Sequence, residues 1–493
     1  MTATASAGRR TDGLVSLVWL RSDLRLVDNP ALVAALDAGA RPVPVYVHAP
    51  DEEAPWQPGA ASRAWLHHSL TALARDLARR GSRLIVRRGP TLDVLRELIR
   101  ESGATAVYWN RRYEPAVSTR DRSVELALSE EGIAVATFNG ALLNEPWDVT
   151  RDGGLPYRVF TPYWKASLRR VTDLAPLPAP DRLPAVAAEM EGLPVAALGL
   201  RPTPGWDSAF WESWRPGEDG AQRALSAFLD RAIAGYDADR NRPDLAGTSR
   251  LSAHLHFGEI SPRQVLAAVR RHADAHVGPG LMRNTEAFVR EIGWREFGHH
   301  LLHHFPHTTA QPLDERFSRF PWAGDHDAAL DLWQRGRTGI PLVDAGMREL
   351  WQTGWMHNRV RMIVASLLTK NLQVPWQAGA RWFWDTLVDA DLANNTLGWQ
   401  WTAGCGADAA PFFRIFNPVL QGQRFDPEGT YVRRWVPELS RLPAPHIHAP
   451  WDSPAPSLAD AGVVLGRDYP LPIVDLQSSR AHALACFDAM KRV

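Results

Sequence analysis

The chain has 493 residues, with 55 Lys or Arg and 55 Asp or Glu side chains, so its formal net charge is zero. This length allows two or three domains with cores of their own, and we expect two. The balanced charge excludes a globally basic nucleic-acid-binding protein, so any DNA site must be a local basic patch. Two cysteines exclude a disulfide framework, and no apolar run is long enough to span a membrane, which predicts a cytoplasmic protein.

Short apolar runs alternate with amphipathic segments over the first 140 residues. This alternation predicts a doubly wound parallel α/β sheet, a Rossmann-like domain over 14–140. No Gly-x-Gly-x-x-Gly follows the first strand, so the fold label by itself supplies no dinucleotide site. The strand-like runs are 14–20, 43–47, 84–88, 106–109 and 135–138, and the clearest amphipathic segments are 62–80 and 91–102.

Proline, alanine and leucine dominate between 173 and 205, with little periodicity. Such a composition is typical of a linker, and we place an interdomain linker over 141–215. Helical patterns prevail beyond it, which predicts a mostly α-helical domain over 216–485. A final helix is expected near 478–491.

The C-terminal half concentrates carboxylates, amides, arginines and indoles in three short stretches, 355–362, 389–401 and 413–417. Buried polar groups are costly unless a ligand or a partner satisfies their hydrogen bonds. These stretches therefore predict the lining of a large, flat, polar-edged cofactor site.

The order and spacing of these residues resemble the FAD-binding half of the DNA photolyase and cryptochrome family, most closely the bacterial cyclobutane pyrimidine dimer photolyases. The resemblance runs from Leu14 to about Leu439. It implies a deoxyribodipyrimidine photolyase, in which reduced FAD, excited by light, passes an electron to a pyrimidine dimer in DNA. The dimer would be flipped out of the duplex to reach the site. We expect an α/β antenna domain, a helical FAD-binding domain and a monomer.

The segment from Gly247 to Ser252 precedes a helical pattern, and its hydroxyls and backbone amides suit a helix cap or an anion cradle. The resemblance implies that it holds the diphosphate of FAD, and that Arg361 and Asp389 form a buried ion pair beside the flavin. The residues that the resemblance assigns to FAD are Tyr236, Thr248, Ser249, Arg250, Leu251, Ser252, Trp355, Arg361, Asp389, Asp391 and Asn395.

Glu291, Trp294 and Arg295 share one face of a predicted helix. From the residues alone, a surface salt bridge beside a core tryptophan is the ordinary explanation. The resemblance implies instead that Glu291 stabilises charge on the damaged bases, and that Trp294 and Trp401 stack on the dimer. It also assigns Arg240 and Arg359 to the DNA phosphates.

Trp355, Asn358 and Met362 have the spacing of a single helical stripe, in which a buried amide is unexpected. Cyclobutane dimer photolyases resemble this chain in having Asn and Met at positions 358 and 362, whereas (6-4) photolyases are expected to have His at both. Asn395 also resembles photolyases rather than plant cryptochromes, although Thr396 and Leu397 depart from the best-known bacterial enzymes. The alternatives are a cryptochrome-like photoreceptor with a signalling partner, or a (6-4) photolyase.

The chain contains 21 tryptophans, an unusual number. Trp399, Trp376 and Trp322 match three indoles that, in the family, carry an electron from the surface to the photoexcited flavin. A single tryptophan is usually core packing, but three matched positions favour a relay.

Two further features have no assigned role. The His299–His304 run has helical spacing suited to a metal, yet neither an acidic partner nor a zinc motif accompanies it; we expect a partly exposed helix face and no metal. The segments 21–25 and 108–114 resemble the antenna domain of the family, which leaves folate, deazaflavin, a second flavin or no second chromophore open.

Overall fold

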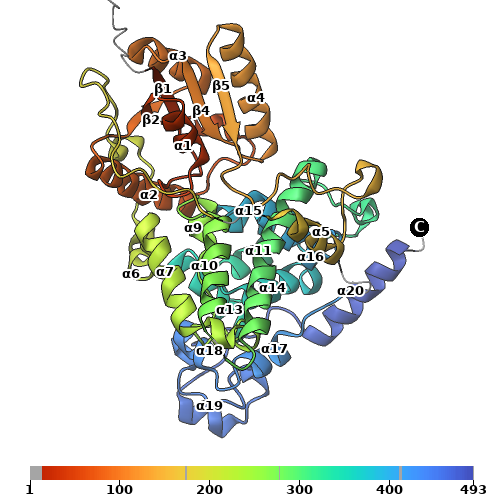
Figure 1. The fold of residues 1–493 in the computed structure, drawn as a ribbon. Helices are drawn as coiled ribbons and strands as arrows, with labels where there is room; N and C mark the ends of the chain where they lie inside the picture. The colour runs from red at the N-terminus through yellow and green to blue at the C-terminus, as the bar shows by residue number, and fades with distance from the viewer. Residues whose placement is uncertain (1–13, 173–174, 277, 410–412, 492–493) are drawn as a thin grey trace, which may run out of the picture.

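The computed structural model describes residues 14–172, 175–276, 278–409 and 413–491. An α/β part, drawn red to orange in Figure 1, lies above a larger helical part. The elements of the α/β part are β1 (Val15–Trp19), α1 (Pro30–Asp37), β2 (Arg41–His48), α2 (Ala60–Arg79), β3 (Ile85–Arg88), α3 (Thr91–Ser102), β4 (Ala106–Asn110), α4 (Pro115–Glu130) and β5 (Ala134–Phe138).

The five strands form one parallel sheet in the order β3-β2-β1-β4-β5. Successive side chains of a strand point to opposite faces of a sheet, and the buried clusters divide in the same way. Val18 and Val86 pack with α1 and α2 on one face, whereas Leu17 and Val45 pack with α3 and α4 on the other. The predicted doubly wound parallel sheet is confirmed.

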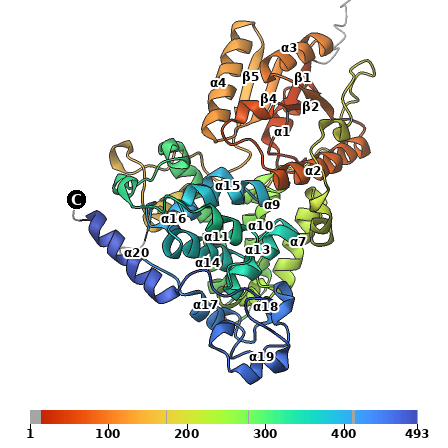
Figure 2. The ribbon, with the colours of Figure 1, turned by 180° about the vertical axis from the view of Figure 1, so that it is seen from behind.

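The helical part is centred on α11, α14 and α16, which lie together in the views of Figures 1 and 2. No helix among the described residues is long and apolar enough to cross a membrane. The helices of the rest of the chain are α5 (Phe160–Arg170), α6 (Phe210–Ser213), α7 (Glu218–Arg231), α8 (Tyr236–Asp239), α9 (Ser252–His256), α10 (Pro262–Ala275), α11 (Leu281–His304), α12 (Asp327–Gln334), α13 (Pro341–Thr353), α14 (Asn358–Ser366), α15 (Trp376–Thr386), α16 (Leu392–Ala403), α17 (Pro418–Phe425), α18 (Thr430–Trp435), α19 (Ala455–Ala461) and α20 (Leu476–Lys491).

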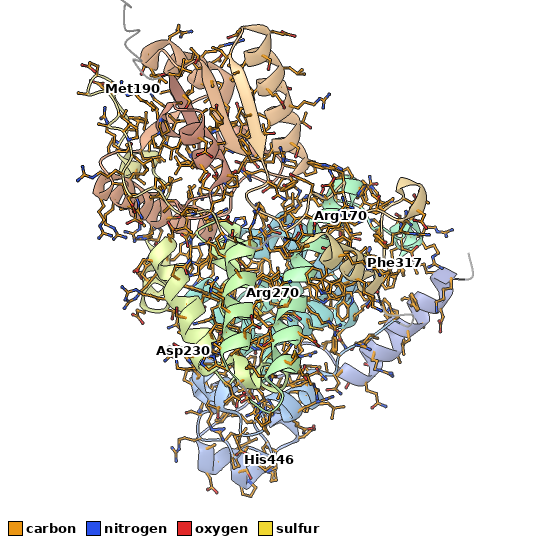
Figure 3. All side chains as sticks on the ribbon, viewed as in Figure 1. Arg170, Met190, Asp230, Arg270, Phe317 and His446 are labelled. Atoms are coloured by element: carbon orange, nitrogen blue, oxygen red, sulfur yellow. The ribbon has the colours of Figure 1, made fainter. Side chains whose placement is uncertain are left out.

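The proline-rich stretch lies along the edge of the sheet. The backbone N–H of Leu193 donates to the carbonyl of Val86 on β3 at 2.9 Å, and Met190, labelled in Figure 3, is buried against the sheet. The stretch therefore covers an edge strand that would otherwise expose unpaired backbone groups. The expected linker also contains α5, which packs on α11. Residues 173–174 lie outside the described residues, and the domain boundaries stay a prediction.

Arg25 joins the two parts. Its fully buried guanidinium donates to the carbonyls of Asp28 at 2.6 Å, Gly140 at 2.6 Å and Gly258 at 2.9 Å. Gly258, in the turn between α9 and α10, has φ +63°, and a Cβ atom there would lie 2.1 Å from the carbonyl oxygen of Ser22. Glycine at this position is what lets the helical part approach the end of β1.

Replacing Arg25 by Met should lower the free energy of unfolding by about 3 kcal/mol, because buried carbonyls left without donors cost about 1–3 kcal/mol each. Urea denaturation followed by tryptophan fluorescence measures the change. Arg79→Met is the control, since the Arg79 side chain is 66% exposed and its loss should change stability by less than about 0.5 kcal/mol. Equal stability of the two variants would show that Arg25 does not join the parts.

Candidate active site

Four side chains predicted to contact the cofactor meet at one place in the helical part. Arg361 donates to Asp389 at 2.8 Å, so the expected ion pair is present. The guanidinium carbon of Arg361 lies 5.9 Å from the centre of the Trp355 ring, and that of Arg250 lies 4.4 Å from the same ring. We call Arg250, Trp355, Arg361 and Asp389 the arginine–indole cluster. It combines stacking surface, positive charge and hydrogen-bonding groups.

The expected helical stripe of Trp355, Asn358 and Met362 is wrong. α13 ends at Thr353, its C-cap Gly354 has φ +68°, and residues 355–357 are not helical. α14 begins only at Asn358, with His357 as its N-cap, so Trp355 lies outside the helix. The Asn358 amide is exposed rather than buried. Asn358 and Met362 are still one turn apart on α14 and share a face.

The segment containing Thr248 and Ser249 does not cap a helix with its hydroxyls. α9 begins at Ser252, Leu251 occupies the N-cap position, and no side-chain cap hydrogen bond is made. Arg250 has φ 52°, a left-handed conformation that is uncommon for a residue with a side chain. The cap interpretation is therefore wrong, because the chain turns through Arg250 instead.

Tyr236 lies close to this segment in sequence, on α8. It is buried, and its ring packs edge-on against Phe288 with the ring centres 5.3 Å apart. Burial raises the pKa of its hydroxyl, and the charge of Glu291 adds to the shift. Tyr236 is therefore a neutral hydroxyl at physiological pH. Its contact with a diphosphate, like that of the 248–252 segment, stays a prediction.

Glu291 and Arg240 form an ion pair with 2.5 Å between Oε1 and Nη1. Burial raises the pKa of Glu291, although Arg240 opposes the shift. Burial alone would lower the pKa of Arg240, but Glu291 raises it above its ordinary value. The structure thus joins the residue predicted to contact the damaged bases with one predicted to contact the DNA backbone.

Arg359 lies in a region of positive charge. Burial and the charges of Arg240, Arg424 and Arg414 lower the pKa of Arg359. Its Nη2 donates to Asn241 at 2.5 Å, whereas its buried Nε has no hydrogen-bond partner among the described residues. An anionic ligand would relieve the repulsion among these guanidinium groups and accept from that Nε.

Trp294 and Trp401 come from neighbouring helices, since α11 packs on α16, and both indoles are partly exposed. Phe160 lies parallel to Trp294, with ring centres 3.8 Å apart and an interplanar angle of 8°. Phe160 was not among the expected site residues, because its segment was taken for a linker. Aromatic residues at helical spacing, Phe160, Tyr163 and Trp164, are the sequence signal that could have revealed this helix.

The three predicted relay indoles lie in or against one apolar cluster. Trp399 and Trp376 are buried, whereas Trp322 is partly exposed. Asn395, one turn before Trp399 on α16, donates to the carbonyl of Ala380 at 3.0 Å. Two buried indoles and the partly exposed Trp322 suit electron transfer from the surface, and the relay itself stays a prediction.

Asp391 is the N-cap of α16 and faces two histidines. Its Oδ1 accepts from the backbone N–H of Asn394 at 2.8 Å, and its Oδ2 lies 3.5 Å from His299 and 3.8 Å from His256. Burial alone would raise the pKa of Asp391, but His299, His256 and Arg295 hold it well below its ordinary value. Asp391 is therefore ionised, an acceptor at the start of α16.

The expected exposed face of the His299–His304 run is wrong for its first two members. His299 is 7% exposed and His300 is 0% exposed, because this side of α11 packs on the segments before α5 and α16. His300 accepts from the N–H of Tyr157 and donates to the carbonyl of Pro146, both at 3.0 Å. Over the described part of the chain, no group of three His, Cys, Asp or Glu side chains is placed to hold a metal.

A small cleft lies between the α/β part and the helical part. The ends of β1 and β4 form one wall with Asp23 and residues 110–114, and α9 and α11 form the other with His256, Arg295 and His299. Ligands of open parallel sheets commonly bind where the strand order reverses, which here is between β1 and β4. The two segments that resemble the antenna domain therefore meet in this cleft.

Glu296 is a buried carboxyl beside this cleft that the sequence did not single out. Its Oε2 accepts from the N–H groups of Leu143 at 2.9 Å and Asn144 at 3.2 Å, whereas its buried Oε1, 3.8 Å from Nη1 of Arg295, has no hydrogen-bond partner among the described residues. Burial raises the pKa of Glu296 to about 7, although Arg295 and the two amides oppose the shift. The sequence signal that could have identified Glu296 was its position next to Arg295, on the side of α11 that faces the core.

The donors around the arginine–indole cluster suit FAD. The Nδ1 atom of His357 accepts from the N–H of Arg359, so Nε2 carries the proton, and this buried Nε2 has no partner among the described residues. Arg250 and Arg361 add positive charge, and Trp355 offers a flat apolar surface. FAD carries phosphate oxygens, ring carbonyls and a planar ring that would match these groups.

Two family models match the chain. Residues 16–181 match the family described as DNA photolyase, and residues 288–489 match the one described as the FAD binding domain of DNA photolyase. A deoxyribodipyrimidine photo-lyase of Agrobacterium fabrum is 46% identical over 97% of this chain and 98% of its own length. Cryptochrome-1 of Arabidopsis thaliana is 41% identical over 95% of this chain and 69% of its own length.

A solved structure is similar over the whole chain. The crystal structure of a bacterial class III photolyase from Agrobacterium tumefaciens superposes with a TM-score of 0.94 and 45% sequence identity. The match covers 99% of this chain and 100% of that one. The likeness therefore includes both the sheet and the helical part.

Glu296→Gln should make the protein more stable than the wild type above pH 7. The folded-state pKa of about 7 is above the ordinary 4.5, so the folded protein binds the proton more tightly than the unfolded chain. Stability from this group is present below pH 4.5 and is lost as the pH rises towards 7. As the pH rises from 5 to 8, the free energy of unfolding of the variant should therefore increase by on the order of 3 kcal/mol relative to that of the wild type.

Urea unfolding at several pH values measures this difference. Glu130→Gln, at an exposed position on α4, is the control, and its dependence of stability on pH should be the same as that of the wild type. A Glu296→Gln profile that also runs parallel would contradict the assignment.

Proposed function

The chain belongs to the DNA photolyase and cryptochrome family, and we propose that it is a deoxyribodipyrimidine photolyase that repairs cyclobutane pyrimidine dimers in DNA under light. The observation that carries this proposal is the arginine–indole cluster, in which the Arg361–Asp389 pair lies beside Trp355 and Arg250. The resemblance assigns all four of these residues to the FAD site. They occur here in a chain that resembles photolyases from end to end.

When bound, reduced FAD supplies the photoexcited electron that opens the cyclobutane ring. Thr248, Ser249, Leu251 and Ser252, with Tyr236, would hold the diphosphate. The arginine–indole cluster would flank the ring, and Asp391 and Asn395 would accept from and donate to its polar edge. The ion pair of Arg361 and Asp389 keeps both charges in place, since removal of either would strand the other.

The lesion would lie against Asn358 and Met362, between Trp294 and Trp401. Glu291, with its raised pKa, would hydrogen-bond the damaged bases and stabilise charge that develops on them. Arg240 and Arg359 would bind the phosphates on either side. A flipped dimer costs less to extrude than a normal base pair because it is poorly stacked.

Trp399, Trp376 and Trp322 would carry electrons inward to reduce the bound flavin. Trp322 is partly exposed whereas Trp376 and Trp399 are equally buried, which supports entry of the electron at Trp322. This route concerns the preparation of the active redox state, and repair by an already reduced enzyme does not need it.

Two alternatives remain as outcomes of experiment. A cryptochrome-like photoreceptor would bind FAD and signal through a partner, and the plant cryptochrome relative favours it. A (6-4) photolyase is disfavoured because positions 358 and 362 are not histidines. Asn395, where plant cryptochromes are expected to have Asp, favours repair over signalling.

We further propose a monomer in the cytoplasm, with a second chromophore in the cleft between the two parts. Both cysteines are unpaired, which suits a reducing compartment. The identity of the chromophore stays open among folate, deazaflavin and flavin.

The repair assay tests the function directly. Purified protein should carry FAD and, under reducing conditions with near-UV or blue light, restore undamaged bases in dimer-containing oligothymidylate, measured by chromatography. The same mixture kept in the dark is the control. FAD binding without light-dependent repair would favour the photoreceptor.

Glu291→Ala should lower the repair yield about tenfold while FAD content stays unchanged, because a lost hydrogen bond to a charged group costs about 1.5–3 kcal/mol. The change also frees Arg240, so affinity for undamaged DNA should be kept or raised. Glu286→Ala, at an exposed position on the same helix, is the control. A loss of FAD larger than the loss of repair would make Glu291 a structural residue.

A further inference from the structure

We propose that Phe160 is a positioning residue for lesion recognition: it stacks on the back of Trp294 and holds this indole ready to stack on the flipped dimer. The proposal rests on the proposed function, because it takes Trp294 as a wall of the lesion site. Phe160 does not contact the dimer itself.

Phe160 packs flat against one face of the Trp294 indole and limits its movement. Phe160 and Trp294 are nearly parallel, with ring centres 3.8 Å apart, and Phe160 is 2% exposed. Phe297 packs edge-on against the same indole, with ring centres 6.0 Å apart and an interplanar angle of 69°. The indole is held on one face and at one side, so any rotation about its side-chain bonds breaks the stacking. Trp294 keeps partial exposure for a ligand.

The backbone of α11 is shaped for this contact. A Cβ atom at Gly293 would lie 2.6 Å from the ring of Trp164, which is on α5. Glycine inside a helix costs about 1 kcal/mol relative to alanine. Here it lets α5 approach α11 next to Trp294, so the stacking depends on closely packed helices rather than on a mobile side chain.

The start of α5 also contacts the segment that follows α16, the helix that carries Trp401. The carboxyl of Asp408, in the segment that follows α16, is close enough to the backbone N–H of Phe160 for this group to lower the pKa of Asp408, against the effect of burial. The N–H of Asp408 in turn donates to the carbonyl of Arg158 at 3.2 Å. The start of α5 is therefore attached to α11 through Trp294 and to the end of α16, the helix of Trp401.

This arrangement reduces the entropy lost on binding. A side chain that is immobilised only when the ligand arrives costs about 0.5–1.5 kcal/mol of binding free energy. Phe160 immobilises Trp294 beforehand. The effect belongs to the stacked lesion and not to the phosphate contacts, which set the affinity for undamaged DNA.

The test compares Phe160→Ala, Phe160→Leu and Phe160→Tyr in the FAD-containing protein. The dissociation constants for dimer-containing and undamaged oligothymidylate are measured at one salt concentration, with FAD content and melting temperature as checks of folding. Phe160→Leu keeps apolar volume without a planar ring and serves if the alanine variant does not fold. Phe305→Ala, in the same apolar cluster, is the control for lost packing.

Aromatic pairs contribute about 0.5–1.5 kcal/mol beyond their buried area, so loss of the ring should weaken dimer binding roughly 2- to 12-fold. Affinity for undamaged DNA should be unchanged in Phe160→Ala and Phe160→Leu, and Phe160→Tyr should behave as wild type. Phe305→Ala should keep the wild-type ratio of the two affinities.

The proposal is overturned if both affinities fall together in Phe160→Leu, if the ratio stays at its wild-type value, or if Phe160→Tyr loses as much as Phe160→Leu. A wild-type protein that does not prefer dimer-containing DNA would instead overturn the proposed function.

Discussion

The packing of α11 on α16 is the constraint on which the candidate site depends. α11 carries Glu291 and Trp294, and α16 carries Asn395 and Trp401, so the distance between these helices sets the distance between the groups proposed to hold the lesion and the flavin edge. The helices also meet through polar groups, since Nε2 of His299 on α11 lies 3.5 Å from Oδ2 of Asp391 at the start of α16. The helices are in contact at Gly298, where a Cβ atom would lie 3.4 Å from the Asn394 side chain, an ordinary van der Waals distance.

Buried charged groups have different partners around the proposed flavin position and around the proposed DNA position. Around the flavin position, Arg361 has Asp389 and Asp391 has two histidines, so each charge is held by the protein itself. Around the DNA position, the charges of Arg240, Arg414 and Arg424 act on Arg359, whose Nε has no hydrogen-bond partner in the described part of the chain. A pre-formed site suits a cofactor that stays bound to the enzyme. A positively charged surface suits a DNA substrate that binds and leaves.

Residue patterns predicted regular structure well and burial poorly. The five strands and the 91–102 helix follow from local alternation of apolar and polar side chains, which depends on neighbours in sequence. Trp355 was wrongly placed on a helix because the left-handed turn at Gly354 breaks a pattern whose spacing looks continuous. Asn358 was expected to be buried, and His299 and His300 partly exposed. Which face of a helix is covered depends on partners far away in the chain.

By itself, the sequence determined the family, the alternation that builds the parallel sheet, and the set of residue types suited to FAD and a pyrimidine dimer. Tertiary structure alone decided that Glu291 pairs with Arg240, that Asp391 pairs with histidines, and that Phe160 from a supposed linker supports Trp294. The physical reason is range: strand and helix patterns reflect contacts within a few residues, whereas ion pairs and ring stacking join segments more than 50 residues apart. Such contacts exist only after the helices have packed.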